Sequence, residues 1–324
     1  MTDKKTRKAA RKLLAAGLAV AGLIVQTTVL AATFPDRPVR LIVPYPPGGT
    51  SDNVARSIQQ PLEKALGQTV IIENVSGSAG TVGTAALADA KPDGYTVGIN
   101  ASATITTSPH LTPVNYDLDS FAPVARVAIS YLGIAVRPDF PASNFKEFVE
   151  YAKTHRVTVS NTGIGATTHL CVEALKKETG TQLVQVPFKG SSPSMNAVIN
   201  GHIDAVCDPA LINPMQSGIL KPIVTLTPER WKEIPDTPTY KEATGKAFPV
   251  TNWYVALAPA GTPDDRLQIL TDAFKQALDD PDLAKRFASM GIQPYFSPSA
   301  EVEKELHEEF DTRGDTLKDL GLTQ

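Results

Sequence analysis

Small hydroxyl residues and glycines gather in five short stretches of the sequence, each of which could donate hydrogen bonds to a small anion. A hydrogen bond to a charged carboxylate contributes on the order of 1.5–3 kcal/mol, so a handful reaches the roughly 8 kcal/mol of micromolar binding. Ordinary turns of an α/β protein explain any one stretch, whereas five together indicate an anion site. The stretches are Gly48–Ser51, Gly77–Gly80, Ala101–Thr104, Gly163–Thr168 and Gly190–Ser192.

The first of these stretches lies in the loop Tyr45–Asp52, between an apolar run and a helical pattern. Val39–Val43 reads as a strand, and the apolar residues Val54, Ile58, Leu62 and Leu66 then recur every four positions. A strand–turn–helix of this kind leaves backbone N–H groups at the helix N-terminus without intrahelical partners, beside the positive end of the helix dipole. The loop is therefore predicted to receive a small anion.

Glycine-rich turns also suggest nucleotide binding, but the spacing of these glycines does not fit. The sequence contains no Gly-x-x-x-x-Gly-Lys-Ser/Thr, and Gly77–Gly83 lacks the Gly-x-Gly-x-x-Gly spacing of a dinucleotide site. The five histidines are scattered without zinc-ligand spacing, and no Gly-x-Ser-x-Gly hydrolase motif occurs. We therefore expect no cofactor and no metal ion.

Three further features have a structural and a functional interpretation. Asp204 and Asp208 could form a general acid/base pair, although a strand end preceded by an aspartate is common. His169, near a helix start, favours a structural hydrogen bond over a ligand contact. Cys171 and Cys207 are the two cysteines of the chain. An oxidising compartment would permit a bridge between them, but we expect two buried small apolar side chains instead.

The first 31 residues are predicted to be a signal peptide. Met1–Lys12 carries six basic residues against one acid, an apolar run follows, and Val29–Ala32 offers small residues suited to cleavage. The alternative is an uncleaved membrane anchor, because the apolar run is long. The rest of the chain reads as globular, with 20% charged and 42% apolar residues over the full sequence. Few aromatic residues and a net charge of −3 argue against a nucleic-acid partner.

The pattern of apolar runs predicts two α/β units. Strands and helices alternate from residue 39 to about 99, which indicates βαβ connections and a parallel sheet, and the alternation restarts at residue 144. Two extended runs, near Ile129–Val136 and Val250–Leu257, would cross between the units. The remaining sequence reads as helical, over Asp264–Leu278, Pro281–Met290 and about Ser299–Leu317, and we expect these helices to pack on the first unit.

The motifs resemble those of a known family, the extracytoplasmic solute-binding proteins of tripartite tricarboxylate transporters, the Bug or TctC family. The resemblance extends in order over nearly the whole chain after the leader. The matching segments are Tyr45–Gly49 with Asp52 and Ala55–Arg56, Lys91–Thr96, Gly163-x-Gly165 to Leu170, Val186–Gly190 with Pro193, and Ala258–Pro263.

This resemblance implies an α/β, two-lobed type II periplasmic-binding-protein fold, with two lobes joined by two crossing segments and the ligand cleft between them. Residues 32–130 and 257–324 would form lobe 1, and residues 131–256 lobe 2. The implied function is capture of a small carboxylate, without catalysis, for the permease subunits of an ion-driven membrane transporter. We expect a monomeric, periplasmic protein.

The resemblance also implies the ligand contacts. One ligand carboxylate would lie between the two loops that carry the first and fourth stretches, partly through ordered waters, and further residues would line each lobe. The first loop supplies Tyr45, Gly48, Gly49, Thr50 and Ser51; the second supplies Gly163, Gly165, Ala166, Thr167 and Thr168; lobe 1 adds Ser78, Ala101, Ser102 and Thr104; and lobe 2 adds Phe188, Lys189, Gly190 and Asp208, which would face the variable end of the ligand.

Several positions depart from the usual family pattern. The second glycine-rich turn is Glu73–Gly80 rather than Asn-Arg-x-Gly-Ala-Gly-Gly, Ala166 stands where a hydroxyl residue is common, and Cys207 replaces a bulky apolar residue. These positions lie where the ligand would be selected, so the sequence does not identify the carboxylate. Two other functions stay open: a periplasmic carboxylate sensor feeding a two-component signalling system, and a secreted enzyme that uses Asp204 or Asp208.

Overall fold

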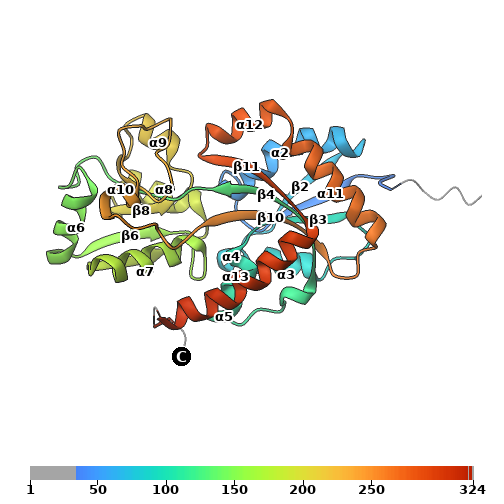
Figure 1. Cartoon of the computed structure of the whole chain (residues 1–324), viewed down its shortest axis with the longest axis horizontal. Helices are drawn as coiled ribbons and strands as arrows, with labels where there is room; N and C mark the ends of the chain where they lie inside the picture. The colour runs from blue at the N-terminus through green and yellow to red at the C-terminus, as the bar shows by residue number, and fades with distance from the viewer. Residues whose placement is uncertain (1–33, 320, 323–324) are drawn as a thin grey trace, which may run out of the picture. The chain divides into compact units, whose positions relative to one another are not determined.

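The computed structural model describes residues 34–319, 321 and 322. The signal peptide expected at residues 1–31 lies outside the described residues. From Arg37 onward the strands form two sheets, one of six strands and one of five, each covered by helices (Figure 1). None of the helices in the described part of the chain combines the length and the apolar character that crossing a bilayer requires.

The first sheet begins with three parallel strands, as the alternating pattern predicts. They are β1 (Val39–Val43), β2 (Val70–Asn74) and β3 (Thr96–Ala101), connected by α2 (Thr50–Leu66) and α3 (Thr81–Ala88). The full order, β11-β4-β10-β3-β1-β2, adds three strands that pair antiparallel. The sheet is therefore mixed, and the expectation of a purely parallel sheet is wrong because β4 (Phe121–Ser130) and β10 (Asn252–Pro259) run against β3 and each other.

The second sheet has the order β7-β6-β8-β5-β9 and repeats this plan. The parallel strands β6 (Val157–Asn161), β7 (Leu183–Pro187) and β8 (Ala205–Asp208) are flanked by antiparallel β5 (Gly133–Val136) and β9 (Lys221–Thr225). Its helices are α6 (Phe145–Thr154), α7 (Thr167–Thr179), α8 (Ser191–Ile199), α9 (Ile212–Gln216) and α10 (Tyr240–Thr244).

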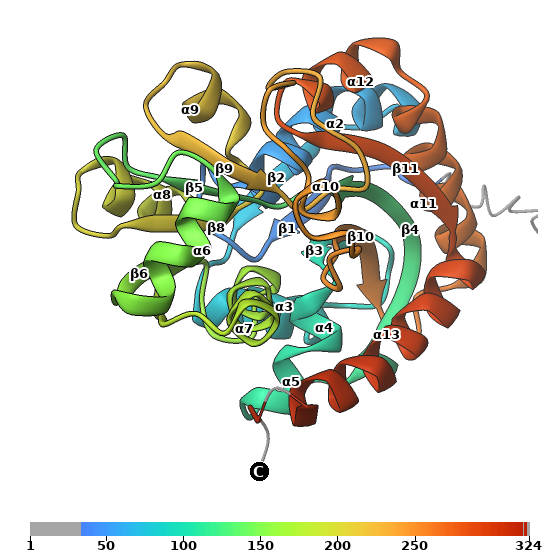
Figure 2. The ribbon, with the colours of Figure 1, turned by 60° about the vertical axis from the view of Figure 1, so that its left-hand side comes forward.

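Two chain segments connect the sheets, as expected. The chain leaves the first sheet after β4 and enters β5 two residues later, and it returns through residues 245–251 to β10. The C-terminal helices α11 (Asp264–Leu278), α12 (Pro281–Ala288) and α13 (Ser299–Asp319) return to the first sheet. There α11 packs on α2, and α13 lies along β4 and the short helix α4 (Ala103–Thr106) (Figure 2).

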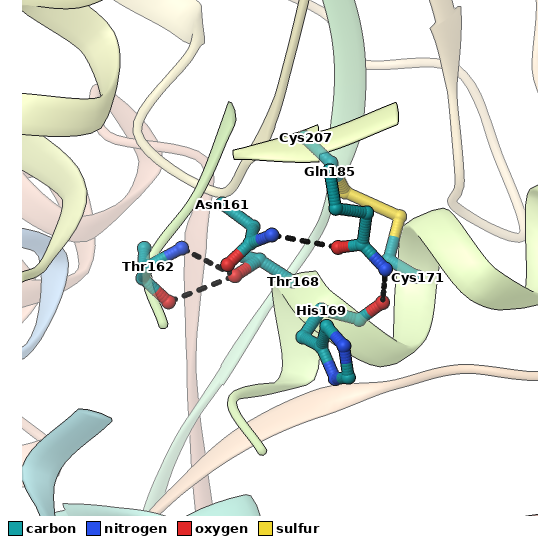
Figure 3. Close-up of a disulfide and its surroundings, with 7 residues drawn as sticks. All are labelled: Asn161, Thr162, Thr168, His169, Cys171, Gln185 and Cys207. Carbon is teal, nitrogen blue, oxygen red and sulfur yellow. Dashed lines mark hydrogen bonds between the residues drawn. A yellow bond between two sulfur atoms is a disulfide. The ribbon is translucent and has the colours of Figure 1, made fainter. Parts of the chain in front are cut away.

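Two expectations about the fold need correction. The segment after α12 is not wholly helical, because β11 (Ile292–Pro298) forms an edge strand against β4. The two cysteines do not remain free: Cys171 of α7 and Cys207 of β8 form a disulfide (Figure 3). Both cysteines are fully buried in the core between this helix and sheet, which places them in contact.

Candidate functional site

Three helices begin at one small cavity. Their first residues, Thr50 of α2, Thr167 of α7 and Ser191 of α8, all line it. The residues before them, Gly49, Ala166 and Gly190, provide no side-chain cap. The backbone N–H groups at each helix start therefore lack intrahelical partners and carry a partial positive charge toward the cavity. Three such termini make a site for an anion.

The cavity lies between residues of both sheets and is narrow. Its volume is about 30 Å³, room for roughly two water molecules. A groove of about 790 Å³ also has Thr50 and Ser191 in its lining, so the two spaces adjoin. The cavity thus suits one carboxylate-sized group, and the groove provides a path to solvent.

The first loop is held in place by Asp52. Its buried carboxylate accepts hydrogen bonds from Gly48 N (2.9 Å), Arg56 Nε (2.7 Å) and Asn74 Nδ2 (2.9 Å). Burial acts to raise the pKa of Asp52, but the hydrogen bonds from Arg56, Gly48 and Asn74 outweigh it and lower the pKa. Asp52 is therefore charged and engaged in structure, and it fixes the turn in which Gly48 adopts a φ of +79°.

The second loop is fixed by its own side chains (Figure 3). Thr168 Oγ1 accepts from Thr162 N (2.9 Å) and lies 2.8 Å from the Thr162 hydroxyl. Asn161 Oδ1 accepts from Gly163 N (2.9 Å), while its Nδ2 donates to Gln185 Oε1 (2.6 Å). These bonds use the polar groups of the loop, except the hydroxyl at the first position of α7.

Two hydroxyls on opposite sides of the cavity have no partner in the described part of the chain. They are Thr50 Oγ1 and Thr167 Oγ1, both buried. Buried polar atoms are almost always hydrogen-bonded, so these two are the natural contacts for a ligand. They come from different sheets, so one bound group can contact both.

The rear wall is formed by β10. Asn252 Nδ2 donates to the hydroxyl of Tyr254 (3.2 Å), and both residues line the cavity. Burial, followed by the nearby Tyr116 and Tyr254 rings, raises the pKa of Tyr45, and burial likewise raises that of Tyr254. Both phenols therefore stay neutral, and the cavity lining contains no lysine, arginine or histidine. An anion here would be held by dipoles and neutral donors.

One carboxylate lies at the edge of this site. Asp208, the last residue of β8, is fully buried; its Oδ1 accepts from Ala210 N (2.8 Å), and its Oδ2 has no partner among the described residues. Burial raises its pKa to about 6, against the smaller opposing effects of Ala210 N and the nearby Ser191 hydroxyl.

The structure brings eight of the sequence-predicted contacts to the cavity. Both expected loops contribute, as does the end of β3. The eight are Tyr45, Gly49, Thr50, Ser51, Ala101, Ala166, Thr167 and Thr168.

The other predicted contacts lie beside the cavity rather than in its lining. Gly48 lines the adjoining groove, Ser78 and Lys189 are exposed, and Phe188 is half-buried. The hydroxyls of Ser102 and Thr104 are bonded to Glu309 and to the Ala101 carbonyl.

Three predicted glycines mark where the loops of the two sheets touch. A Cβ at Gly163 would lie 2.7 Å from the Cβ of Ala79, and one at Gly190 would lie 2.9 Å from Cδ of Pro46. At Gly165, which has a φ of +87°, it would lie 3.0 Å from the Ser108 hydroxyl. These positions control how closely the loops approach.

Five lining residues are absent from the sequence-predicted set: Thr162, Ser191, Pro209, Asn252 and Tyr254. Ser191 belongs to a donor-rich stretch, and Thr162 and Pro209 adjoin predicted contacts, so their neighbours signal them. Asn252 and Tyr254 lie in an expected crossing segment whose sequence carries no cluster of donors.

The remaining candidates have structural partners. Asp204 Oδ2 accepts from Thr158 N (2.9 Å) and Thr158 Oγ1 (2.7 Å), and Arg137 lies 3.4 Å from Oδ1. Gly165 N donates to His169 Nδ1 (3.4 Å), and burial lowers the His169 pKa. Among the described residues, no group of three or more His, Cys, Asp or Glu side chains is arranged to hold a metal ion.

Comparisons with known proteins agree with this geometry. A UPF0065 protein from the gbd 5' region of Cupriavidus necator is 32% identical over 320 residues, which cover 97% of each chain. The structure of the periplasmic binding protein BugD matches with a TM-score of 0.85 and 32% identity, covering 90% of this chain and 99% of that one. MatC from Rhodopseudomonas palustris with bound malate matches with a TM-score of 0.81 and 30% identity, covering 88% and 100%.

These matches confirm the expected two-lobed periplasmic-binding-protein fold. Residues 54–322 also match the sequence model of the tripartite tricarboxylate transporter family receptor, TctC. This chain therefore belongs to the TctC family of solute-binding receptors.

Proposed function

We propose that this protein is a periplasmic solute-binding protein that captures a small carboxylate between two lobes and delivers it to the permease subunits of a tripartite tricarboxylate-type transporter. The lobes would be residues 32–130 with 257–324, and residues 131–256. The observation that carries the proposal is the convergence of three uncapped helix N-termini, and of the unpartnered Thr50 and Thr167 hydroxyls, on one cavity without a cationic side chain.

The energetics suit reversible capture. Hydrogen bonds to a carboxylate from the helix starts and the two hydroxyls contribute on the order of 1.5–3 kcal/mol each, and a few of them reach micromolar affinity. Because donors come from both sheets, the ligand makes contacts in the closed form that an open form would lack, and binding would favour closure. The relative MatC, with bound malate, supports a carboxylate as the ligand class.

The partner and the location rest on the family. The family description names a transporter receptor, and BugD is described as periplasmic. We propose that residues 1–31 direct export and are cleaved, and that the mature protein is a monomer. Mass spectrometry of the protein recovered from the periplasm would test cleavage, and light scattering would test the oligomeric state.

The carboxylate site is tested by replacing each unpartnered hydroxyl with a methyl group. Thr50→Val and Thr167→Val should each weaken binding of the preferred small carboxylate about tenfold, the effect of one lost hydrogen bond to a charged group. The free variants should be as stable as the parent protein, because the lost hydroxyls are buried without partners. Thr81→Val, at the start of α3 and outside the cavity lining, is the matched control.

Isothermal titration calorimetry measures both parts of this test. A screen of small carboxylates by thermal shift first identifies a ligand, since a ligand at 100 times its Kd adds about 2.7 kcal/mol of stability. Unchanged affinity in both cavity variants would refute the assignment of the site. A loss of affinity in Thr81→Val of equal size would attribute the effect to the helix starts in general.

A further inference from the structure

The carboxylate of Asp208 is out of place in a site built for an anion. It is fully buried, and no lysine, arginine or histidine in the described part of the chain forms an ion pair with it. Its Oδ1 is satisfied by Ala210 N, whereas Oδ2 has no hydrogen-bond partner there. A buried acceptor without a partner is costly, and a charged one more so.

The groups around Asp208 show that its free side belongs to the ligand site. Pro209, the next residue, lines the cavity. The Ser191 hydroxyl and the Tyr254 phenol, which also line it, are close enough to interact electrostatically with the Asp208 carboxyl group. The unpartnered oxygen is thus on the side from which a ligand approaches, near the start of α8.

An anionic ligand without a donor would meet this carboxylate unfavourably. Like charges a few ångströms apart repel each other strongly in a buried site, where water screens them little. A ligand with a hydroxyl or an ammonium group would instead donate to Oδ2, while its own carboxylate contacts the helix starts. An ammonium group would also neutralise the Asp208 charge.

We propose that the ligand of this protein is a small carboxylate that also carries a hydrogen-bond donor, an ammonium or a hydroxyl group, and that Asp208 Oδ2 accepts from that donor. This inference rests on the proposed function, because it assumes that the cavity binds the ligand carboxylate. The cavity is small, so the donor lies within a few bonds of the carboxylate. Asp208 is then the residue that separates amino and hydroxy acids from unsubstituted and oxo acids.

The test uses acids that differ at carbon 2 alone, measured by calorimetry at pH 7.5. One set is succinate, malate, aspartate and oxaloacetate. The second is glutarate, 2-hydroxyglutarate, glutamate and 2-oxoglutarate, and the third is propanoate, lactate, alanine and pyruvate. In the chain length that binds best, the ammonium or hydroxyl member should bind at least tenfold more tightly than the unsubstituted member, and the oxo member more weakly still.

Asp208→Asn then reverses the chemistry at one position. Asparagine keeps an oxygen for Ala210 N and presents an amide donor where Oδ2 was, so affinity for the ammonium member should fall at least tenfold and affinity for the oxo member should rise. Asp204→Asn removes the same charge just before the same strand, at a residue bonded to Thr158, and should leave the order of ligands unchanged.

The outcomes separate the two proposals. Binding of unsubstituted or oxo members as tightly as amino and hydroxy members would overturn the role of Asp208 while leaving carboxylate capture intact. Binding of none of the twelve compounds would refute the proposed function itself, and with it this inference. The preference of the unaltered protein is decisive even when Asp208→Asn folds poorly, a point that circular dichroism checks.

Discussion

Replacing Asp208 with asparagine should stabilise the ligand-free protein at neutral pH. Burial raises the pKa of Asp208 from 3.8 to about 6. Between these values the folded protein binds more protons than the unfolded chain, so the free energy of unfolding falls as pH rises. The full effect, reached above pH 6, is a destabilisation of about 3 kcal/mol, since each pKa unit corresponds to about 1.4 kcal/mol. Asparagine does not titrate, and the variant escapes this loss.

Urea unfolding of both proteins at pH values from 4 to 8, without ligand, measures the difference. The variant should gain up to about 3 kcal/mol relative to the parent at pH 7, and the gain should shrink toward pH 4. Asp52→Asn is a control of opposite sign. The pKa of Asp52 is lowered, so its contribution to stability is present at neutral pH and is lost as the pH falls below about 4. A stability difference for Asp208→Asn that does not change with pH would refute the reasoning.

Two further changes test the loops and the bridge. Gly165→Val should abolish ligand binding while the protein stays folded, because a Cβ there lies 3.0 Å from the Ser108 hydroxyl at a φ of +87°; unchanged calorimetric affinity would contradict this. Replacing Cys171 and Cys207 together with alanine should cost about 2–4 kcal/mol in urea unfolding, because the bridge closes a loop between residues 36 apart; equal stability of the reduced and oxidised parent protein would refute it.

Local patterns predict most of the fold because they depend on neighbours in the chain. The strand β1, the helix α11 and the turn at Gly48 all follow from apolar spacing and turn residues. The strand β11 was missed because it contains Pro294 and Pro298, residues that argue against a strand. Prolines are tolerated there because β11 is an edge strand with an irregular register against β4.

The site is predictable only where donors cluster in sequence. Thr50 and Thr167 stand in such clusters, whereas Tyr254 reaches the cavity because β10 pairs between β3 and β4. The pairing of Cys171 with Cys207 likewise depends on how α7 packs on β8. Such long-range placements leave no periodic signal in the chain.

The disulfide has a consequence for how a ligand is measured. It ties α7, which begins with Thr167, to β8, which ends with Asp208. The unpartnered hydroxyl and the unpartnered carboxylate oxygen of the second sheet are thereby held on one crosslinked frame, so less conformational entropy is lost when a ligand orders them. The bridge makes this half of the site a ruler of fixed length, against which the distance between a ligand's acceptor and donor groups is compared.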